Sequence, residues 1–137
     1  MKRLRPGIFI GILFISVQLG LAQWSSVRQL TWNSGGSKAP AVAVDTWGNI
    51  HVVWEDDTAT PDSHEIYYKK SADGGKSWTT NKRLTWTAGK STQPALAVDP
   101  FGALHVVWQD DTPGNGDIYY KTSPDNGANW SAGGRIA

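Results

Sequence analysis

Two aspartates at equivalent positions of a repeated octapeptide are the first residues of this sequence that could carry chemistry. Asp73 lies in SADGGKSW and Asp125 lies in SPDNGANW, and both stretches follow the pattern S-x-D-x-G-x-x-W. A carboxylate acts as a general acid or base when its surroundings move its pKa toward the working pH. Such groups sit in clefts rather than in a repeated turn. We therefore expect a structural role for both aspartates, with catalysis as the alternative.

The residue types that both copies retain suit the closure of a turn. Short serine and aspartate side chains can bond to nearby backbone N–H groups. Glycine permits a positive φ that other residues resist, and the tryptophan can bury its ring, which contributes at most about 3 kcal/mol. The eight residues are Ser71, Asp73, Gly75, Trp78, Ser123, Asp125, Gly127 and Trp130.

Two acidic pairs form a second set of candidates. They open the segments DDTATPDSHE and DDTPGNGD, which we expect to be loops on one rim of the fold. Carboxylates repeated around a rim could bind a hard cation such as calcium or accept hydrogen bonds from sugar hydroxyls. The alternative is that each Asp-Asp-Thr only begins a turn. No D-x-[DN]-x-[DN]-G calcium loop is present, so we assign no metal and no other cofactor. The candidate ligand rim consists of Asp56, Asp57, Asp110 and Asp111.

These motifs belong to a tandem repeat that covers most of the chain. From Arg28 to Thr58 the sequence is identical to the segment 54 residues later at 18 of 31 positions, and the offset then falls to 52. Each unit contains β-branched and aromatic runs separated by turn residues, at 40–45, 50–56, 65–71 and 82–86 in the first unit. No window shows helical periodicity, so we predict an all-β chain without helices.

Four short antiparallel strands in about 50 residues are typical of one blade of a β-propeller. A β-sandwich is the alternative, but its strands have different neighbours and no reason to repeat in sequence. We predict two blades, 33–86 and 87–137, the second truncated at its end, after an extra outer strand of a preceding blade at 23–32. Propellers close with about 4–8 blades. We therefore expect a partial propeller or one that closes by self-association as a homo-oligomer.

The N-terminus has the layout of a secretory signal peptide over residues 1–22. Basic residues precede an apolar run from Ile8 to Ala22, with small residues before Gln23. A retained membrane anchor is the alternative, although the run is shorter than the roughly 20 residues of a membrane-spanning helix. We expect a secreted, extracytoplasmic protein with no membrane contact once the signal is removed.

Charge and cysteine content exclude several classes of function. Without the signal peptide the chain has ten basic and twelve acidic residues, which gives no basic field for nucleic acid. The chain has no cysteine, so it has neither disulfides nor a cysteine for lipid attachment. Its stability must therefore come from packing.

The repeated octapeptide resembles the Asp-box of the sialidase-type superfamily, also called bacterial neuraminidase repeats. The resemblance covers both units and implies a β-propeller in which the box lies on the face away from the substrate site. A sialidase would also need three convergent arginines, a Tyr nucleophile with a Glu, and an Asp acid/base. Arg28, Arg83 and Arg135 fall on predicted outer strands, and the tyrosine pairs repeat as packing residues do. The catalytic residues of that family therefore carry over to nothing in this chain.

These observations predict a secreted, non-catalytic propeller module that binds a glycan or an extracellular protein. The alternatives are a fragment of a sialidase-like exo-glycosidase whose catalytic residues lie in other blades, and a truncated reading frame without a stable fold. We expect His51 and His105 to be packed and hydrogen-bonded, and Trp54 and Trp108 to lie in the core. The more exposed candidates for a sugar platform are Trp47 and its counterpart Phe101.

Overall fold

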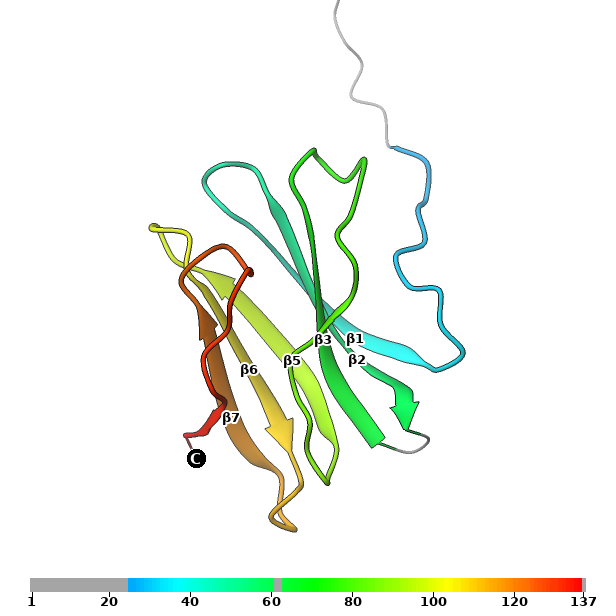
Figure 1. Ribbon diagram of the computed structural model, residues 1–137, viewed down its shortest axis with the longest axis vertical. Helices are drawn as coiled ribbons and strands as arrows, with labels where there is room; N and C mark the ends of the chain where they lie inside the picture. Colours follow the sequence, from blue (N-terminus) through cyan, green and yellow to red (C-terminus); the bar gives the residue numbers. More distant parts are fainter. Residues whose placement is uncertain (1–24, 61–62, 137) are drawn as a thin grey trace, which may run out of the picture.

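The computed structural model describes residues 25–60 and 63–136 as two antiparallel sheets of four strands each (Figure 1). The expected signal sequence, residues 1–22, lies outside the described residues. The first sheet has the order β1 (Ser37–Val44), β2 (Ile50–Thr60), β3 (Ser63–Ser71) and β4 (Lys82–Arg83). The second has the order β5 (Ser91–Val98), β6 (Leu104–Asp110), β7 (Asp117–Ser123) and β8 (Gly134–Arg135).

The described residues contain no helix, which confirms the all-β prediction. Consequently none of them forms a helix that could span a membrane. The four-strand composition of each sheet is also confirmed, and each sheet is a simple meander in which neighbouring strands follow one another in sequence. The two sheets formed by the described residues do not close a ring.

The turn between the first two strands of each sheet is formed by an aspartate that follows the strand. Asp45 Oδ1 accepts hydrogen bonds from the backbone N–H of Trp47 (2.9 Å) and of Asn49 (2.8 Å). Gly48 in this turn has a φ of 83°, which glycine adopts without steric cost. Asp99 and Gly102 repeat the arrangement in the second sheet. The turn between the first two strands therefore has the same hydrogen bonds and the same glycine conformation in both sheets.

The register is the same in both sheets, so repeated residues occupy equivalent positions. Trp54 lies opposite Tyr67 in the first sheet, as Trp108 lies opposite Tyr119 in the second. The two ring pairs have the same geometry, with centroids 5.9 Å apart and an interplanar angle of 23°. Both tryptophans are buried, as we expected from the sequence.

The outer strands are shorter than predicted. The sequence predicted a strand over 82–86, whereas β4 ends at Arg83. Leu84 N still donates to Ile66 O at 2.7 Å, but Ile66 N donates to the Thr85 side chain at 2.8 Å instead of to a strand carbonyl. A side chain thus takes the place of the backbone partner, and the ladder stops there.

The hydrophobic core joins the two sheets. β5 contacts β1, β2 and β3 of the first sheet, and its Leu96 and Val98 pack against the core. Tyr68 of β3 meets Trp130 of the second sheet edge to face, with ring centroids 5.2 Å apart. The buried residues at the centre are Val53, Ile66, Tyr68, Leu84, Leu104, Val106 and Trp108.

The sequence predicted an outer strand over 23–32, and the described part of this segment, residues 25–32, shows no strand pairing with other described residues. Residues 25–32 nevertheless contact the first sheet as residues 82–86 contact the second. Arg28 Nη1 donates to Gly75 O at 3.2 Å, and Lys82 Nζ donates to Gly127 O at 3.3 Å. Both side chains also donate to the next carbonyl along the turn.

A second pair of contacts repeats in the same way. Lys69 Nζ donates to Leu30 O at 2.7 Å, and Lys121 Nζ donates to Leu84 O at 2.6 Å. The same two ammonium groups also lie over the rings of Trp32 and Trp86. Residues 25–32 therefore take the position, relative to the first sheet, of the outer strand of a preceding sheet.

Candidate functional site

The first octapeptide forms a turn closed by its own side chains. Ser71 Oγ accepts from Gly75 N and donates to Asp73 Oδ1, both at 2.8 Å. Asp73 accepts from Ser77 N (2.8 Å) and Ser77 Oγ (2.6 Å), and these bonds lower the pKa of Asp73 to about 2. The Trp78 indole N–H donates to Gly75 O at 3.1 Å. All four residue types of the pattern therefore have a partner within the turn.

The second octapeptide has the same geometry. Ser123 Oγ accepts from Gly127 N and donates to Asp125 Oδ1, both at 2.9 Å. Asn129 donates its backbone N–H (2.7 Å) and its side-chain amide (2.6 Å) to Asp125, which lowers the pKa of Asp125 to about 2. Trp130 Nε1 donates to Gly127 O at 3.2 Å. A carboxylate that stays ionised and fully engaged suits a turn better than proton transfer.

Two of the four rim aspartates lie inside the protein. Asp56 and Asp110 are 1% and 0% exposed. Asp56 accepts from Trp54 Nε1 (3.0 Å) and from Thr58 N (2.9 Å). Burial raises the pKa of Asp56, but its hydrogen bonds outweigh that effect and the pKa is lowered. Asp110 is held similarly, accepting from Ser91 Oγ at 2.8 Å. Neither carboxylate faces solvent.

The other two rim aspartates bond to the backbone just before the first strand of their sheet, and Asp57 lies in β2 and not in a loop as the sequence predicted. Asp57 Oδ1 accepts from Gly36 N at 2.6 Å, and Asp111 Oδ1 accepts from Lys90 N at 2.5 Å. Asp57 is half-buried and Asp111 is exposed. In the part of the chain that the structure describes, no three acidic or histidine side chains cluster as metal ligands would.

A buried His–Tyr–Asp cluster lies at the end of the first sheet, and sequence reasoning did not bring its members together. His51 Nδ1 lies 2.9 Å from Tyr68 OH, and His51 Nε2 lies 3.4 Å from Asp45 Oδ2. Burial lowers the pKa of His51 despite the nearby carboxylate, and burial raises the pKa of Tyr68. Both rings are neutral at pH 7; His51 is 0% exposed, and Tyr68, which is 3% exposed, lines the groove between the sheets. The cluster is therefore structural.

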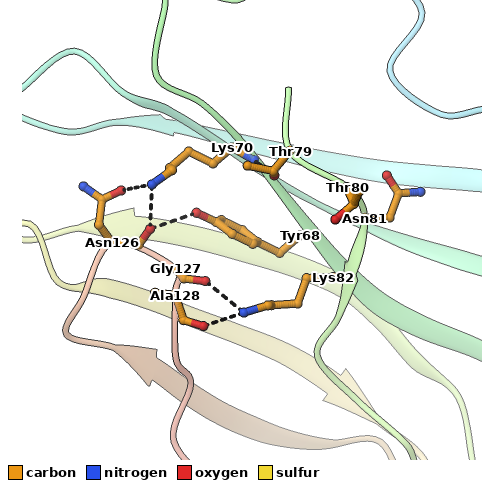
Figure 2. A pocket seen from close by; sticks show the side chains of 9 residues that line it. All are labelled: Tyr68, Lys70, Thr79, Thr80, Asn81, Lys82, Asn126, Gly127 and Ala128. Carbon is orange, nitrogen blue, oxygen red and sulfur yellow. Dashed lines mark hydrogen bonds between the residues drawn. The ribbon is translucent and has the colours of Figure 1, made fainter. Parts of the chain in front are cut away.

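A groove of about 320 Å³ lies between the two sheets beside this cluster (Figure 2). Lys70 Nζ donates to Asn126 O (3.3 Å) and Asn126 Oδ1 (3.1 Å). Lys82 Nζ donates to Gly127 O (3.3 Å) and Ala128 O (2.5 Å). Tyr68 OH lies 3.4 Å from Asn126 O. Two lysines of the first sheet thus hold the second octapeptide.

Asn126 completes the link between the sheets. Its side-chain N–H donates to Asp45 Oδ2 at 2.9 Å. Burial raises the pKa of Asp45, but hydrogen bonds from Asn49, His51 and Asn126 outweigh burial and lower it to about 2. Sequence reasoning missed Asn126 and its lysine partners. The available signal was a difference between the units: Lys70, Lys82 and Asn126 correspond to Thr122, Gly134 and Gly74.

The arginines are separated and each has a local partner. Arg83 Nη2 lies 2.6 Å from Glu65 Oε1, and Arg135 Nη1 lies 3.0 Å from Asp117 Oδ2. Arg28 bonds to the first octapeptide as described above. Among the described residues these side chains form no convergent carboxylate-binding triad.

Two aromatic side chains stand exposed at the turns that join the first two strands of each sheet. Trp47 is 66% exposed and Phe101 is 87% exposed. A Cβ added to Gly102 would overlap the Trp47 ring, so this ring lies directly on the backbone of the second sheet. Trp47 is therefore both accessible and held in place.

Comparison with known proteins adds no relative. No protein-family model matches the chain, and no curated protein matches it significantly. The resemblance to Asp-box repeats depends on the two octapeptides and their spacing alone.

Proposed function

We propose that this chain is an exported, non-catalytic β-propeller module in which each four-strand sheet is one blade. The identical registers and the repeated contacts of residues 25–32 and 82–86 support successive blades around an axis. The turn aspartates and the His51 cluster already form hydrogen bonds within the protein. They are therefore not free to act on a substrate, which favours a binding function over catalysis.

The ligand we propose is a glycan that stacks on Trp47 and Phe101. The observation that carries this proposal is the Trp47 ring, which packs on Gly102 yet remains 66% exposed. A ring fixed in this way offers apolar area at low entropic cost, as aromatic anchors in binding sites do. Equivalent turns on successive blades would present one platform each, which suits a repetitive ligand. Asp57 and Asp111 lie at the other end of the strands and form a separate candidate surface for sugar hydroxyls.

A glycan array probed with the labelled secreted chain tests this function. Trp47→Ala should weaken binding about tenfold, since stacking of this kind contributes about 1 kcal/mol or slightly more. Trp86→Ala is the matched control, because Trp86 is equally exposed but its ring lies against Arg83 and Lys121. Equal losses in both variants, or a folded chain that binds no glycan, would contradict the proposal. Retention of an extracellular protein with no glycan bound would favour a protein ligand, and hydrolysis of a fluorogenic sialoside would contradict the non-catalytic part.

A further inference from the structure

The two sheets meet through two unlike surfaces. We call the surface that the first sheet turns toward the second its outgoing face, and the surface that the second sheet turns toward the first its incoming face. Because the sheets are repeats, each has both faces. Among the described residues, 25–60 and 63–136, no sheet neighbours the incoming face of the first sheet or the outgoing face of the second, as the arrangement in Figure 1 shows.

The incoming face of the first sheet leaves apolar side chains in solvent. Val42 and Val44 of β1 are 65% and 60% exposed. Their counterparts in β5, Leu96 and Val98, are partly buried against the core, because the first sheet covers them. The difference between the two sheets is therefore the missing neighbour and not the side-chain type.

The outgoing face of the second sheet has an uncovered copy of the buried cluster. The side chains of Asp45 and His51 are 0% exposed, beneath Asn126 of the second sheet. The side chains of Asp99 and His105 make the equivalent pair, 3.6 Å apart, but are 32% and 36% exposed. This cluster is complete except for the turn that would cover it.

Glycines on the incoming faces match aromatic rings on the outgoing faces. Gly102 lies under the Trp47 ring, and a Cβ there would overlap it. The equivalent Gly48 has open space around it, with nothing within 4 Å of an added Cβ. Phe101, the counterpart of Trp47, is the ring without such a partner.

A second glycine repeats this relation. A Cβ on Gly127 would overlap the Tyr68 hydroxyl of the first sheet. On the equivalent Gly75, a Cβ would meet only atoms of its own sheet, at 3.9 Å. Tyr120 is the counterpart of Tyr68 on the outgoing face of the second sheet. The two uncovered faces thus present the same residues, at equivalent positions, as the two faces that meet at the junction between the sheets.

We propose that two copies of this chain dock head to tail. The outgoing face of the second sheet in one copy covers the incoming face of the first sheet in the other copy. The contact is heterologous, because the two copies use different surfaces, so it continues until a ring closes or a filament grows. Three copies would supply six sheets, within the roughly 4–8 blades at which propellers close.

Docking also decides the partner of residues 28–32. They occupy the position that β8 of the docking copy would take, so only one of the two segments can remain there. β8 has two residues, both exposed. In the register that β4 has with β3, Arg28 and Gln29 pair with Tyr120 and Tyr119 of the docking copy and replace β8. Residues 28–32 thus complete the partner's second sheet.

Light scattering of the purified secreted chain measures the assembly, with two variants that each block one face. Val44→Glu places a charge on the incoming face, and Ala97→Glu places one on the exposed side of β5 on the outgoing face. Ala88→Glu, in the loop between β4 and β5, is the control for the charge itself. Far-ultraviolet circular dichroism checks that each variant is folded.

Wild type and Ala88→Glu should have about three times the monomer mass, and each face variant should be a folded monomer. A mixture of Val44→Glu and Ala97→Glu should form dimers containing one chain of each, because one intact pair of faces remains. Wild type that is monomeric and folded would overturn the proposal. A face variant that dimerises by itself would overturn it too, since that result requires like faces to pair.

A disulfide tests the strand exchange separately. The chain has no cysteine, so Gln29→Cys combined with Tyr119→Cys introduces the only two thiols. Figure 1 shows residues 25–32, in blue, at one edge of the molecule and β7 at the opposite edge, so a bond between the two positions joins different copies. Oxidation should give covalent oligomers, and Gln29→Cys with Pro113→Cys should not. If the chains assemble but the disulfide between positions 29 and 119 does not form, β8 keeps its place beside β7 and the strand exchange is wrong.

Discussion

Replacing Asn126 by glycine isolates the side-chain contribution to the junction between the sheets. Asn126 has a φ of 61°, and its counterpart Gly74 has a φ of 68°, so glycine keeps the backbone conformation. The Asn126 carbonyl, which accepts from Lys70 Nζ at 3.3 Å, is unchanged. Only two bonds are lost: the one to Asp45 Oδ2 at 2.9 Å and the one from Lys70 Nζ at 3.1 Å.

The expected loss of stability is about 1–2 kcal/mol at pH 6. Hydrogen bonds to charged groups contribute about 1.5–3 kcal/mol each when buried. These two lie beside an open groove, so about 1 kcal/mol each is a better value. Relief of the positive φ on changing to glycine returns up to about 1 kcal/mol.

The same substitution has a pH signature. Hydrogen bonds lower the pKa of Asp45 in the folded protein to about 2, below its ordinary 3.8. A depressed folded pKa contributes stability above the unfolded value, and that stability is lost as the pH falls through the folded one. Asn126→Gly removes one of these bonds, so its destabilisation should be larger at pH 6 than at pH 2.5.

Urea unfolding followed by tryptophan fluorescence at the two pH values measures both effects. Gly74→Asn is the matched control, because asparagine tolerates this φ and nothing lies within 4 Å of an added Cβ. The control should cost at most the strain of the positive φ, up to about 1 kcal/mol, and the loss should be the same at both pH values. Unchanged stability of Asn126→Gly at pH 6, or an equal loss at both pH values, would refute the role of this residue.

Two further substitutions test the buried polar groups, again by urea unfolding. Ser123→Ala leaves the buried Gly127 N–H without its acceptor and should cost about 1–2 kcal/mol; a loss below about 0.5 kcal/mol would contradict the turn-closing role. Tyr68→Phe leaves His51 Nδ1 unpaired in the interior and should cost about 1–2 kcal/mol, whereas Tyr120→Phe, in the solvent-accessible copy of the cluster, should cost less than half as much. Equal losses for the two tyrosines would show that burial of the cluster does not matter.

Local sequence patterns were sufficient for the inner strands and for the two octapeptides, but not for the extent of the outer strands. The bonds of Ser71 and Asp73 reach residues at most four positions away, so residue types and spacing determine them. The strands at 40–45 and 65–71 lie within β1 and β3 as observed, apart from Asp45, which begins the turn. Repetition strengthened both predictions, because the same pattern of residue types occurs in each unit.

Burial and contacts between the sheets could not be read from the same patterns. Asp56 and Asp57 are adjacent and identical in type. Asp56 is buried and accepts from Trp54 and Thr58, whereas Asp57 accepts from Gly36 just before β1. Strand direction and side-chain alternation decide which of the two points inward. The lysines of the groove were missed because they depart from the repeat, and a search for repetition passes over such positions.

The junction between the sheets has a consequence for the order of folding. Within the first sheet, His51 and Tyr68 meet across 17 residues of chain, whereas Asp45 and Asn126 meet across 81. Closing the longer loop costs more chain entropy, so each meander should form before the junction does. During that interval the outgoing face of the first sheet is open, and the second sheet of another molecule can reach it. Refolding at high protein concentration should therefore yield domain-swapped oligomers, in which the first sheet of one chain packs against the second sheet of another. Refolding at high dilution should yield the intramolecular junction.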